Sequence, residues 1–217
     1  MVWLMVEFGI ANLGREAFLS KLSPIEDLQQ LKDPKSLVHR LLTCVYQSTR
    51  NSGDVTRHAA QTVAQAVGAE FFEWNIDAAI DGYVNTVSQA VGRELTWDKD
   101  DLSLQNIQAR ARGPGAWLLA NLRGALLLAT SNRSEAAVGY ATMDGDTCGG
   151  LAPIAGIDKA FLRAWLCWME KTGPHGIGPL PALSVVNAQV PTAELRPPEE
   201  SQTDESDLMP YDVLDAI

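Results

Sequence analysis

Polar side chains follow two apolar runs of the sequence, at the points where each run would leave a β-sheet. Gln47–Gly53 (QSTRNSG) comes directly after Leu41–Tyr46 (LLTCVY), and Ser131–Glu135 (SNRSE) follows Gly124–Thr130 (GALLLAT). Open parallel sheets bind ligands at the carboxyl ends of their strands, so both polar runs are candidate binding segments. The hydroxyls and amides of Gln47–Gly53 suit the phosphates or ribose of a nucleotide. A turn followed by a helix cap is the alternative interpretation.

Three carboxylates lie close together in the sequence after the second apolar run, at Glu135, Asp144 and Asp146. Such oxygen ligands suit Mg²⁺, which proteins commonly share with substrate phosphates. An Asp-Gly-Asp sequence is also typical of a plain turn, and Ser134-Glu135 can simply open a helix. The pattern therefore leaves both a magnesium site and purely structural roles open.

Asn106 and Arg110 are four residues apart in the segment NIQARAR and share one face of a predicted helix. The planar fork of arginine suits a phosphate or carboxylate ligand. Arg112 is two residues further on and faces elsewhere. Either both arginines bind a ligand, or Arg110 does so while Arg112 is solvated or salt-bridged.

The histidines and cysteines form no recognisable catalytic pattern. No histidine belongs to a motif with a serine or cysteine nucleophile, and the cysteines are odd in number and widely spaced. We therefore expect neither a disulfide framework nor a zinc site, and no nucleophile or other catalytic side chain supplied by the protein. The residues concerned are His39, His58, His175, Cys44, Cys148 and Cys167.

Composition and charge exclude several classes of protein. Of 217 residues, 46% are hydrophobic and 20% are charged, which excludes global disorder, and no apolar run approaches the length of a membrane span. The net charge of −10 argues against binding nucleic acid by phosphate neutralisation. The acidic segment Glu199–Ile217 holds seven of the 27 acidic residues and no basic one, leaving 20 acidic and 17 basic residues elsewhere. Met1–Ile10 lacks the features of a signal peptide, so we expect a cytoplasmic protein without membrane or nucleic-acid partners.

Hydrophobic periodicity predicts helices that alternate with strands, which indicates a doubly wound parallel α/β sheet in a single domain, 1–217. We expect residues 13–36 to be a loop or insertion. An interruption is expected around Gly113-Pro114-Gly115. The predicted helices are Val2–Phe8, Pro34–Arg40, Asp54–Val67, Ile80–Val91, Leu104–Arg123 and one from about Phe161 to Met169. The predicted strands are Leu41–Tyr46, Glu70–Ile76 and Gly124–Thr130.

Several motifs, taken in order, resemble the NAD synthetase family: NIQARAR, LLATSNRSE, GYATMDGD, Pro153 with Lys159, and PTAELRPPEESQTDESDLMPYDVLD. The match runs from about Leu41 to Ile217, and the long Gly14–Arg40 region looks like that of the glutamine-dependent, two-domain branch of the family. The resemblance implies a Rossmann-like adenine-nucleotide α-hydrolase fold and a homodimer. It also implies ATP-dependent amidation of deamido-NAD to NAD through an acyl-adenylate, with Mg²⁺ as cofactor and ammonia from a glutaminase domain of the parent chain.

The resemblance also assigns individual residues. It implies that deamido-NAD contacts Asn106, Arg110, Glu135 and Tyr140, with Glu135 also a candidate metal ligand. It implies that ATP contacts Thr130, Lys159 and Thr192, and it gives Asp204 and Glu205 a supporting role.

The sequence departs from the family pattern in two places. It contains neither the SGGxDS pyrophosphate loop nor a nitrilase-like glutaminase domain, and we interpret it as truncated at both ends. One alternative is a catalytically incomplete module of the same fold that binds a dinucleotide or dimerises. Another is a different ATP pyrophosphatase that aminates XMP or aspartate, against which GYATMDGD and PTAELRP count.

Overall fold

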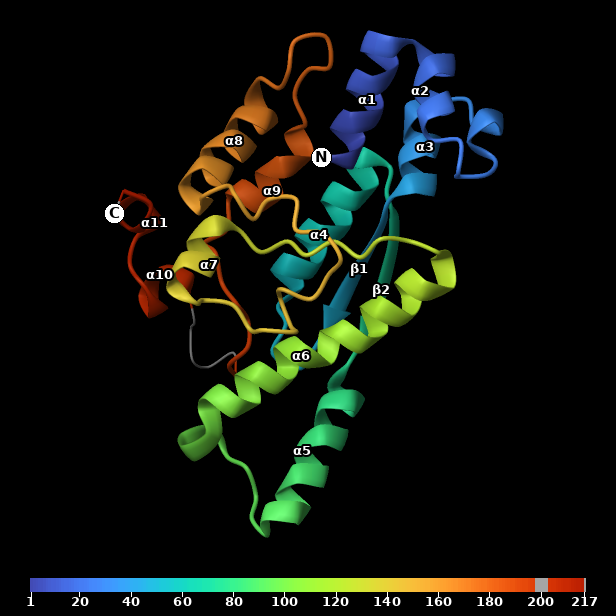
Figure 1. Ribbon diagram of the computed structural model, residues 1–217. Helices are drawn as coiled ribbons and strands as arrows, with labels where there is room; N and C mark the ends of the chain where they lie inside the picture. The colour runs from blue at the N-terminus through green and yellow to red at the C-terminus, as the bar shows by residue number, and fades with distance from the viewer. Residues whose placement is uncertain (198–202, 217) are drawn as a thin grey trace. The chain divides into compact units, whose positions relative to one another are not determined.

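The computed structural model describes residues 1–197 and 203–216 (Figure 1). Two units result from the contacts within it. The first unit is Met1–Tyr46, Asp54–Glu73 and Cys167–Ala188; the second is Gln47–Gly53, Trp74–Leu166 and Gln189–Ile217. Glu199 and Glu200 of the acidic segment lie outside the described residues. In the part of the chain that is described, no helix has both the length and the apolar character needed to span a bilayer.

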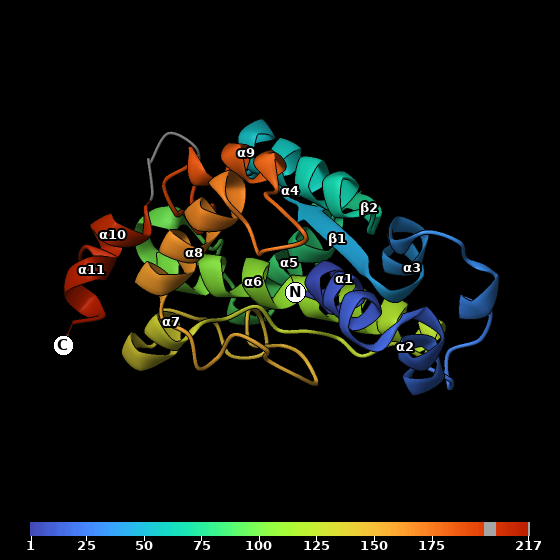
Figure 2. The same ribbon diagram turned by 90° about the horizontal axis from the view of Figure 1, so that it is seen from above.

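Helices α1 to α3 build the core of the first unit. Helix α1 lies against α2 and α3 (Figure 2). Asp33 caps α3 by accepting the backbone N–H of Ser36 at 2.9 Å, and Pro34 occupies the first turn, as the sequence predicts. The buried core consists of Val6, Phe18, Leu19, Leu28, Leu37 and Val38. The elements are α1 (Val2–Leu13), α2 (Arg15–Lys21), a 3₁₀ turn η1 (Leu28–Gln30) and α3 (Pro34–Leu41), so residues 13–36 include regular structure.

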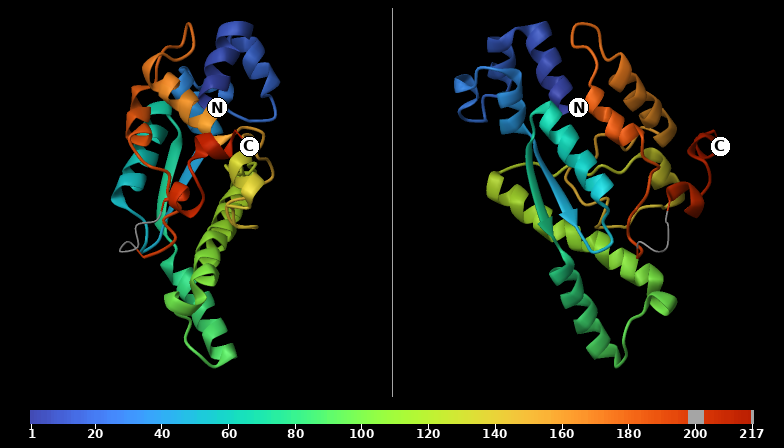
Figure 3. Two further views of the ribbon diagram at one scale, coloured as in Figure 1. Left: turned by 90° about the vertical axis from the view of Figure 1, so that its left-hand side faces the viewer. Right: turned by 180° about the vertical axis from the view of Figure 1, so that it is seen from behind.

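Strands β1 (Thr43–Ser48) and β2 (Glu70–Asn75) flank α4 (Asp54–Val67) in the sequence and form a two-stranded sheet. The strands are parallel, because the bonds from Glu70 N to Leu42 O and from Ile76 N to Ser48 O keep one offset along both chains. The two strands run side by side in Figure 3. The predicted βαβ order is therefore confirmed, with β1 starting two residues later than expected. The first unit is completed by the end of α8 (Lys159–Lys171), from Cys167 on, with η2 (Pro181–Leu183) and α9 (Ser184–Asn187).

The expected strand Gly124–Thr130 is wrong as a strand. Among the described residues it forms a single parallel bridge, in which Leu128 pairs with Leu151. Leu126 is 61% exposed, so the apolar run is not enclosed within a sheet. A run of apolar residues is compatible with a buried strand. A strand also needs a neighbouring strand along its length to form the ladder of hydrogen bonds, and this segment has only the one bridge among the described residues.

Helices α5 (Asp77–Val91) and α6 (Trp97–Arg123) contact one another in the second unit, and Figure 1 shows them splayed at an angle, with α5 below α6. The sequence predicts both, including the left-handed Gly92 that ends α5. The second unit also contains α7 (Arg133–Val138), the start of α8, α10 (Asp204–Asp207) and α11 (Tyr211–Leu214).

The interruption expected around Gly113-Pro114-Gly115 is also wrong, because α6 continues through Pro114. The glycines instead permit close packing: a Cβ at Gly113 would lie 3.3 Å from both the carbonyl oxygen of Asp144 and the sulfur of Cys148. The non-helical residue of α6 is Asp100, with φ −125°. Its carboxylate accepts two bonds of 2.7 Å from Arg93 and one of 3.0 Å from the backbone N–H of Thr96. These bonds hold the first turn away from helical geometry.

Candidate functional site

In the second unit, one lysine contacts two carboxylates. The ammonium of Lys159, at the start of α8, lies 3.0 Å from Glu135 Oε1 and 3.8 Å from Asp204 Oδ2. The lysine side chain is 22% exposed, that of Glu135 17% and that of Asp204 7%. The charges are therefore less screened than those of a surface ion pair. We refer to Lys159, Glu135, Asp204 and Tyr211 as the lysine cluster.

The backbone around α7 fixes Glu135. Asn132 accepts the backbone N–H of Glu135 at 3.1 Å, and Glu135 Oε2 accepts the N–H of Asn132 at 3.1 Å. This reciprocal pair is a capping box, which the sequence reading anticipated only as Ser134-Glu135 opening a helix. Because Asn132 is only 2% exposed, the carboxylate is anchored from within the fold.

The start of α8 is capped by residues from two other segments. Ser134 Oγ accepts the backbone N–H of Lys159 at 2.8 Å, and Asp215 Oδ2 accepts that of Ala160 at 2.9 Å. Ser134 in turn donates to Asp215. These bonds satisfy N–H groups that a helix start leaves without partners, and they fix the backbone that carries the Lys159 side chain.

Two tyrosines bond acidic residues of α10. Tyr211 donates from its hydroxyl to Asp204 Oδ2 at 2.9 Å, and Tyr140 donates to Asp207 Oδ2 at 2.9 Å. Burial raises the pKa of Asp204, while the Tyr211 bond and the Lys159 charge oppose that rise. Burial, followed by the Asp204 charge, raises the pKa of Tyr211, so the phenol stays a donor.

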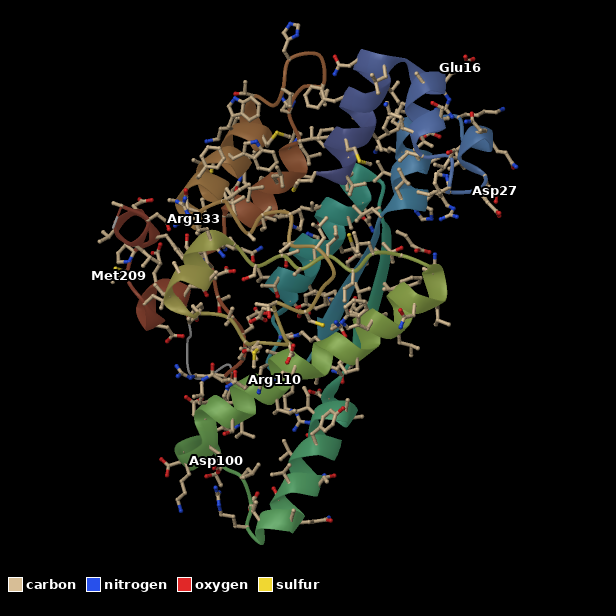
Figure 4. All side chains as sticks on the ribbon, in the orientation of Figure 1. Glu16, Asp27, Asp100, Arg110, Arg133 and Met209 are labelled. Carbon is tan, nitrogen blue, oxygen red and sulfur yellow. The ribbon has the colours of Figure 1, made fainter. Side chains whose placement is uncertain are left out.

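A second group of predicted residues lies on α6, where Figure 4 labels Arg110. Asn106 Oδ1 accepts the hydroxyl of Thr142 at 2.9 Å, and Arg110 Nε donates to the carbonyl of Met143 at 3.1 Å. Arg110 also lines a cavity of about 410 Å³ with the aromatic side chains of Tyr83 and Trp117. The cavity combines apolar walls with a cation, which suits a ligand that has a ring and an anionic group.

A pair of buried amides positions the segment that contains Thr192. Asn51 Nδ2 donates to Gln108 Oε1 at 2.9 Å and to the carbonyl of Leu195 at 3.1 Å, and Gln108 Nε2 donates to the same carbonyl at 2.6 Å. Asn51 is 8% and Gln108 4% exposed. Sequence reasoning missed both residues as partners, although Asn51 lies in the polar run after the first strand and Gln108 in NIQARAR.

The remaining predicted residues make contacts of their own. Thr130 is exposed just before Ser131, whose hydroxyl bonds Glu135 at 3.3 Å. The hydroxyl of Thr192 accepts the backbone N–H of Glu194 at 3.3 Å. Glu205 pairs with Arg163 at 3.1 Å.

The predicted carboxylates do not come together as a metal site. In residues 1–197 and 203–216, no three His, Cys, Asp or Glu side chains are placed to hold a metal ion. Glu135 already contacts the Lys159 ammonium, and Asp146 Oδ2 accepts the N–H of Thr142 at 2.8 Å. Asp144 has φ 61°, as expected of a turn residue. Among the described residues the three predicted carboxylates are thus not gathered into one preformed metal site, and the turn interpretation of Asp144-Gly145-Asp146 holds.

Comparisons with known proteins agree on one family. The sequence profile of a family described as NAD synthase matches residues 35–217. A glutamine-dependent NAD(+) synthetase of Xanthomonas campestris is 34% identical over 176 residues, covering 81% of this chain and 30% of the relative. The chain thus spans about a third or less of the length of such relatives.

Solved structures show the same relationship. The crystal structure of a glutamine-dependent NAD(+) synthetase from Cytophaga hutchinsonii has a TM-score of 0.81 and 45% identity, covering 99% of this chain and 34% of that one. The Acinetobacter baumannii enzyme, solved in complex with ADP, has a TM-score of 0.58 and 25% identity over 71% of this chain and 28% of that one. The predicted Rossmann-like adenine-nucleotide α-hydrolase fold is confirmed.

Proposed function

This chain belongs to the NAD synthase family, and on that premise we propose that it carries the ATP-dependent amidation step of a glutamine-dependent NAD(+) synthetase. The enzyme is a ligase that forms a carbon–nitrogen bond. A carboxylate oxygen of deamido-NAD attacks the α-phosphorus of ATP, and pyrophosphate leaves. Ammonia then attacks the carbonyl carbon of the acyl-adenylate and forms the carbon–nitrogen bond. The carbon–oxygen bond to AMP breaks, AMP leaves with its electron pair, and the added nitrogen loses a proton to give the amide.

The lysine cluster is the observation that carries this proposal. Both steps move negative charge onto phosphate oxygens, and a fixed cation stabilises such charge best where water is scarce. Lys159 supplies the cation, Glu135 and Asp204 fix its position, and the capping box fixes Glu135. The reaction needs no protein nucleophile, since positioning and electrostatics can supply catalysis.

The deamido-NAD contacts are proposed for the cavity at α6. The bond from Arg110 Nε to Met143 sets the plane of the guanidinium, and the plane of an arginine fork decides which carboxylate or phosphate it can bind bidentately. Asn106, one helical turn before Arg110 on α6, accepts the hydroxyl of Thr142 and is proposed to contact the same substrate. Tyr140 is proposed to border the same substrate, through the segment that Asp207 holds.

The other assignments stay part of the proposal. Thr130 and Thr192 would contact ATP, and Mg²⁺ would arrive with the ATP phosphates as part of the substrate, with Glu135 as the candidate carboxylate. We also propose that the protein is cytoplasmic and homodimeric, and that its ammonia comes from a glutaminase domain. The family relationship supports these statements, and none is needed for the lysine cluster.

A thermal-shift titration of the 217-residue chain tests the proposal. The ligands are deamido-NAD, NAD, ATP with Mg²⁺, and XMP. A ligand at a hundredfold excess over its dissociation constant stabilises the folded state by about 2.7 kcal/mol. We expect deamido-NAD and ATP to raise the melting temperature and XMP to leave it unchanged. Stabilisation by XMP alone would instead indicate a different ATP pyrophosphatase.

A further inference from the structure

Tyr211 is a fully buried tyrosine in the four-residue helix α11, and sequence reasoning assigns it no role. Its hydroxyl donates to Asp204 at 2.9 Å, and its ring centroid lies 5.5 Å from the Lys159 ammonium. One side chain thus meets the lysine in two ways, through a carboxylate and through an aromatic face. A cation within about 6 Å of a ring centroid is attracted to the ring.

The contacts of Tyr211 also explain how the segment reaches the lysine. The backbone N–H of Tyr211 donates to Glu205 Oε1 at 3.3 Å, and Glu205 pairs with Arg163 of α8. Residues 204 to 211 are therefore attached to α8 one turn beyond Lys159. The ammonium thus has Asp204 and the Tyr211 ring near it as well as Glu135.

We propose that Tyr211 is a positioning residue for Lys159, holding its ammonium through Asp204 and through the ring at the place where ATP phosphates bind. The inference rests on the proposed function, because it gives Tyr211 a role only if Lys159 contacts ATP. A free lysine side chain loses conformational entropy when it is ordered. Holding the side chain in advance removes part of that cost from ATP binding.

A purely structural role is the competing explanation, since Tyr211 has no exposed surface. The two roles differ in which ligand is affected. A positioning role acts through Lys159 and therefore affects ligands that have phosphates. Loss of packing would weaken the binding of adenosine and ATP alike.

Calorimetric titrations of the 217-residue chain with ATP and with adenosine separate these roles. Tyr211→Phe keeps the ring and removes the bond to Asp204, so the fold is retained more readily than with alanine. We expect ATP affinity to fall about threefold to tenfold, the range of one hydrogen bond, with adenosine affinity unchanged. Tyr46→Phe is the matched control, because it also removes the hydroxyl of a partly buried tyrosine, which contacts Thr56 at 2.9 Å, outside the cluster.

The variant Lys159→Ala identifies which statement fails. We expect Lys159→Ala to weaken ATP binding, and Tyr211→Phe to add nothing in that background. No effect of Lys159→Ala would overturn the proposed ATP contact and the positioning role with it. Three outcomes would overturn the positioning role alone. In the first, ATP affinity falls with Lys159→Ala but not with Tyr211→Phe. In the others, Tyr211→Phe still lowers ATP affinity in the Lys159→Ala background, or it lowers adenosine affinity as much as ATP affinity.

Discussion

Replacing Asn132 by alanine tests whether the capping box of α7 holds the lysine cluster in place. The Asn132 side chain accepts the backbone N–H of Glu135 at 3.1 Å, and it is only 2% exposed. Alanine removes this acceptor and leaves the Glu135 N–H without its cap. We expect both a less stable protein and a less well fixed Glu135.

The magnitude follows from the geometry of one lost cap. Removing an N-cap side chain costs about 0.5–2 kcal/mol, typically ~1. We expect the cost for Asn132 in the upper part of this range of energies, because water reaches the backbone N–H of Glu135 poorly once the buried cap is removed. The helix has six residues, so few other helical bonds can compensate. We therefore expect a loss of about 1–2 kcal/mol in the free energy of unfolding, which lowers the melting temperature by roughly 2–8 °C in a chain of this size.

Urea unfolding followed by circular dichroism measures the loss, with the slope of free energy against urea expected to stay constant. Asn132→Ser is the matched control, because serine is an equally favoured cap and should restore most of the stability. ATP titrations of both variants then show whether Glu135 matters to the site. A loss below about 0.3 kcal/mol for alanine, or serine no better than alanine, would refute the capping argument.

Three further changes test single residues. Arg110→Ala should weaken deamido-NAD binding by ~1–3 kcal/mol in calorimetry, while Arg123→Ala at the end of the same helix should not; equal affinities would contradict the assignment. Glu135→Gln keeps the shape of the capping side chain and removes its charge, so ATP binding should depend less on Mg²⁺, and an unaltered Mg²⁺ titration would leave Glu135 as a cap and lysine partner only. Burial raises the pKa of Asp204, so the folded state binds this proton more tightly than the unfolded state and the contribution to stability falls as pH rises from about 4 through the folded pKa. Asp204→Asn should therefore gain stability relative to the wild type across that window in urea unfolding, and a difference that does not vary with pH would show that the residue does not titrate as described.

Local signals in the sequence predicted local structure well. Asp33-Pro34 and Gly92 act on the residues next to them, and the start of α3 and the end of α5 lie where these residues predict them. Gly124–Thr130 failed because a strand needs a partner, and only Leu128 has one in the described residues. The interruption predicted at Pro114 was wrong because the α6 backbone accommodates a proline inside the helix.

In the site, too, single residues could be predicted from the sequence, whereas the contacts between them could not. The family resemblance named Glu135 and Lys159 individually, but their contact joins positions 24 residues apart. Tyr211 and Gln108 went unnoticed because a buried tyrosine and a buried glutamine look like ordinary residues until their partners are known. Their partners, Asp204 and the carbonyl of Leu195, are distant in sequence or reached only through the fold.

The two carboxylates on Lys159 are not equivalent toward an incoming phosphate. A phosphate oxygen that binds the ammonium must displace or share one of them. Glu135 is nearer, at 3.0 Å, and its other oxygen is tied to the backbone of Asn132. Asp204 is 3.8 Å away, and its raised pKa means that burial already disfavours its charge. We therefore expect a phosphate oxygen to share the ammonium on the Asp204 side, with the Tyr211 hydroxyl keeping that carboxylate in place, while Glu135 keeps the ammonium oriented.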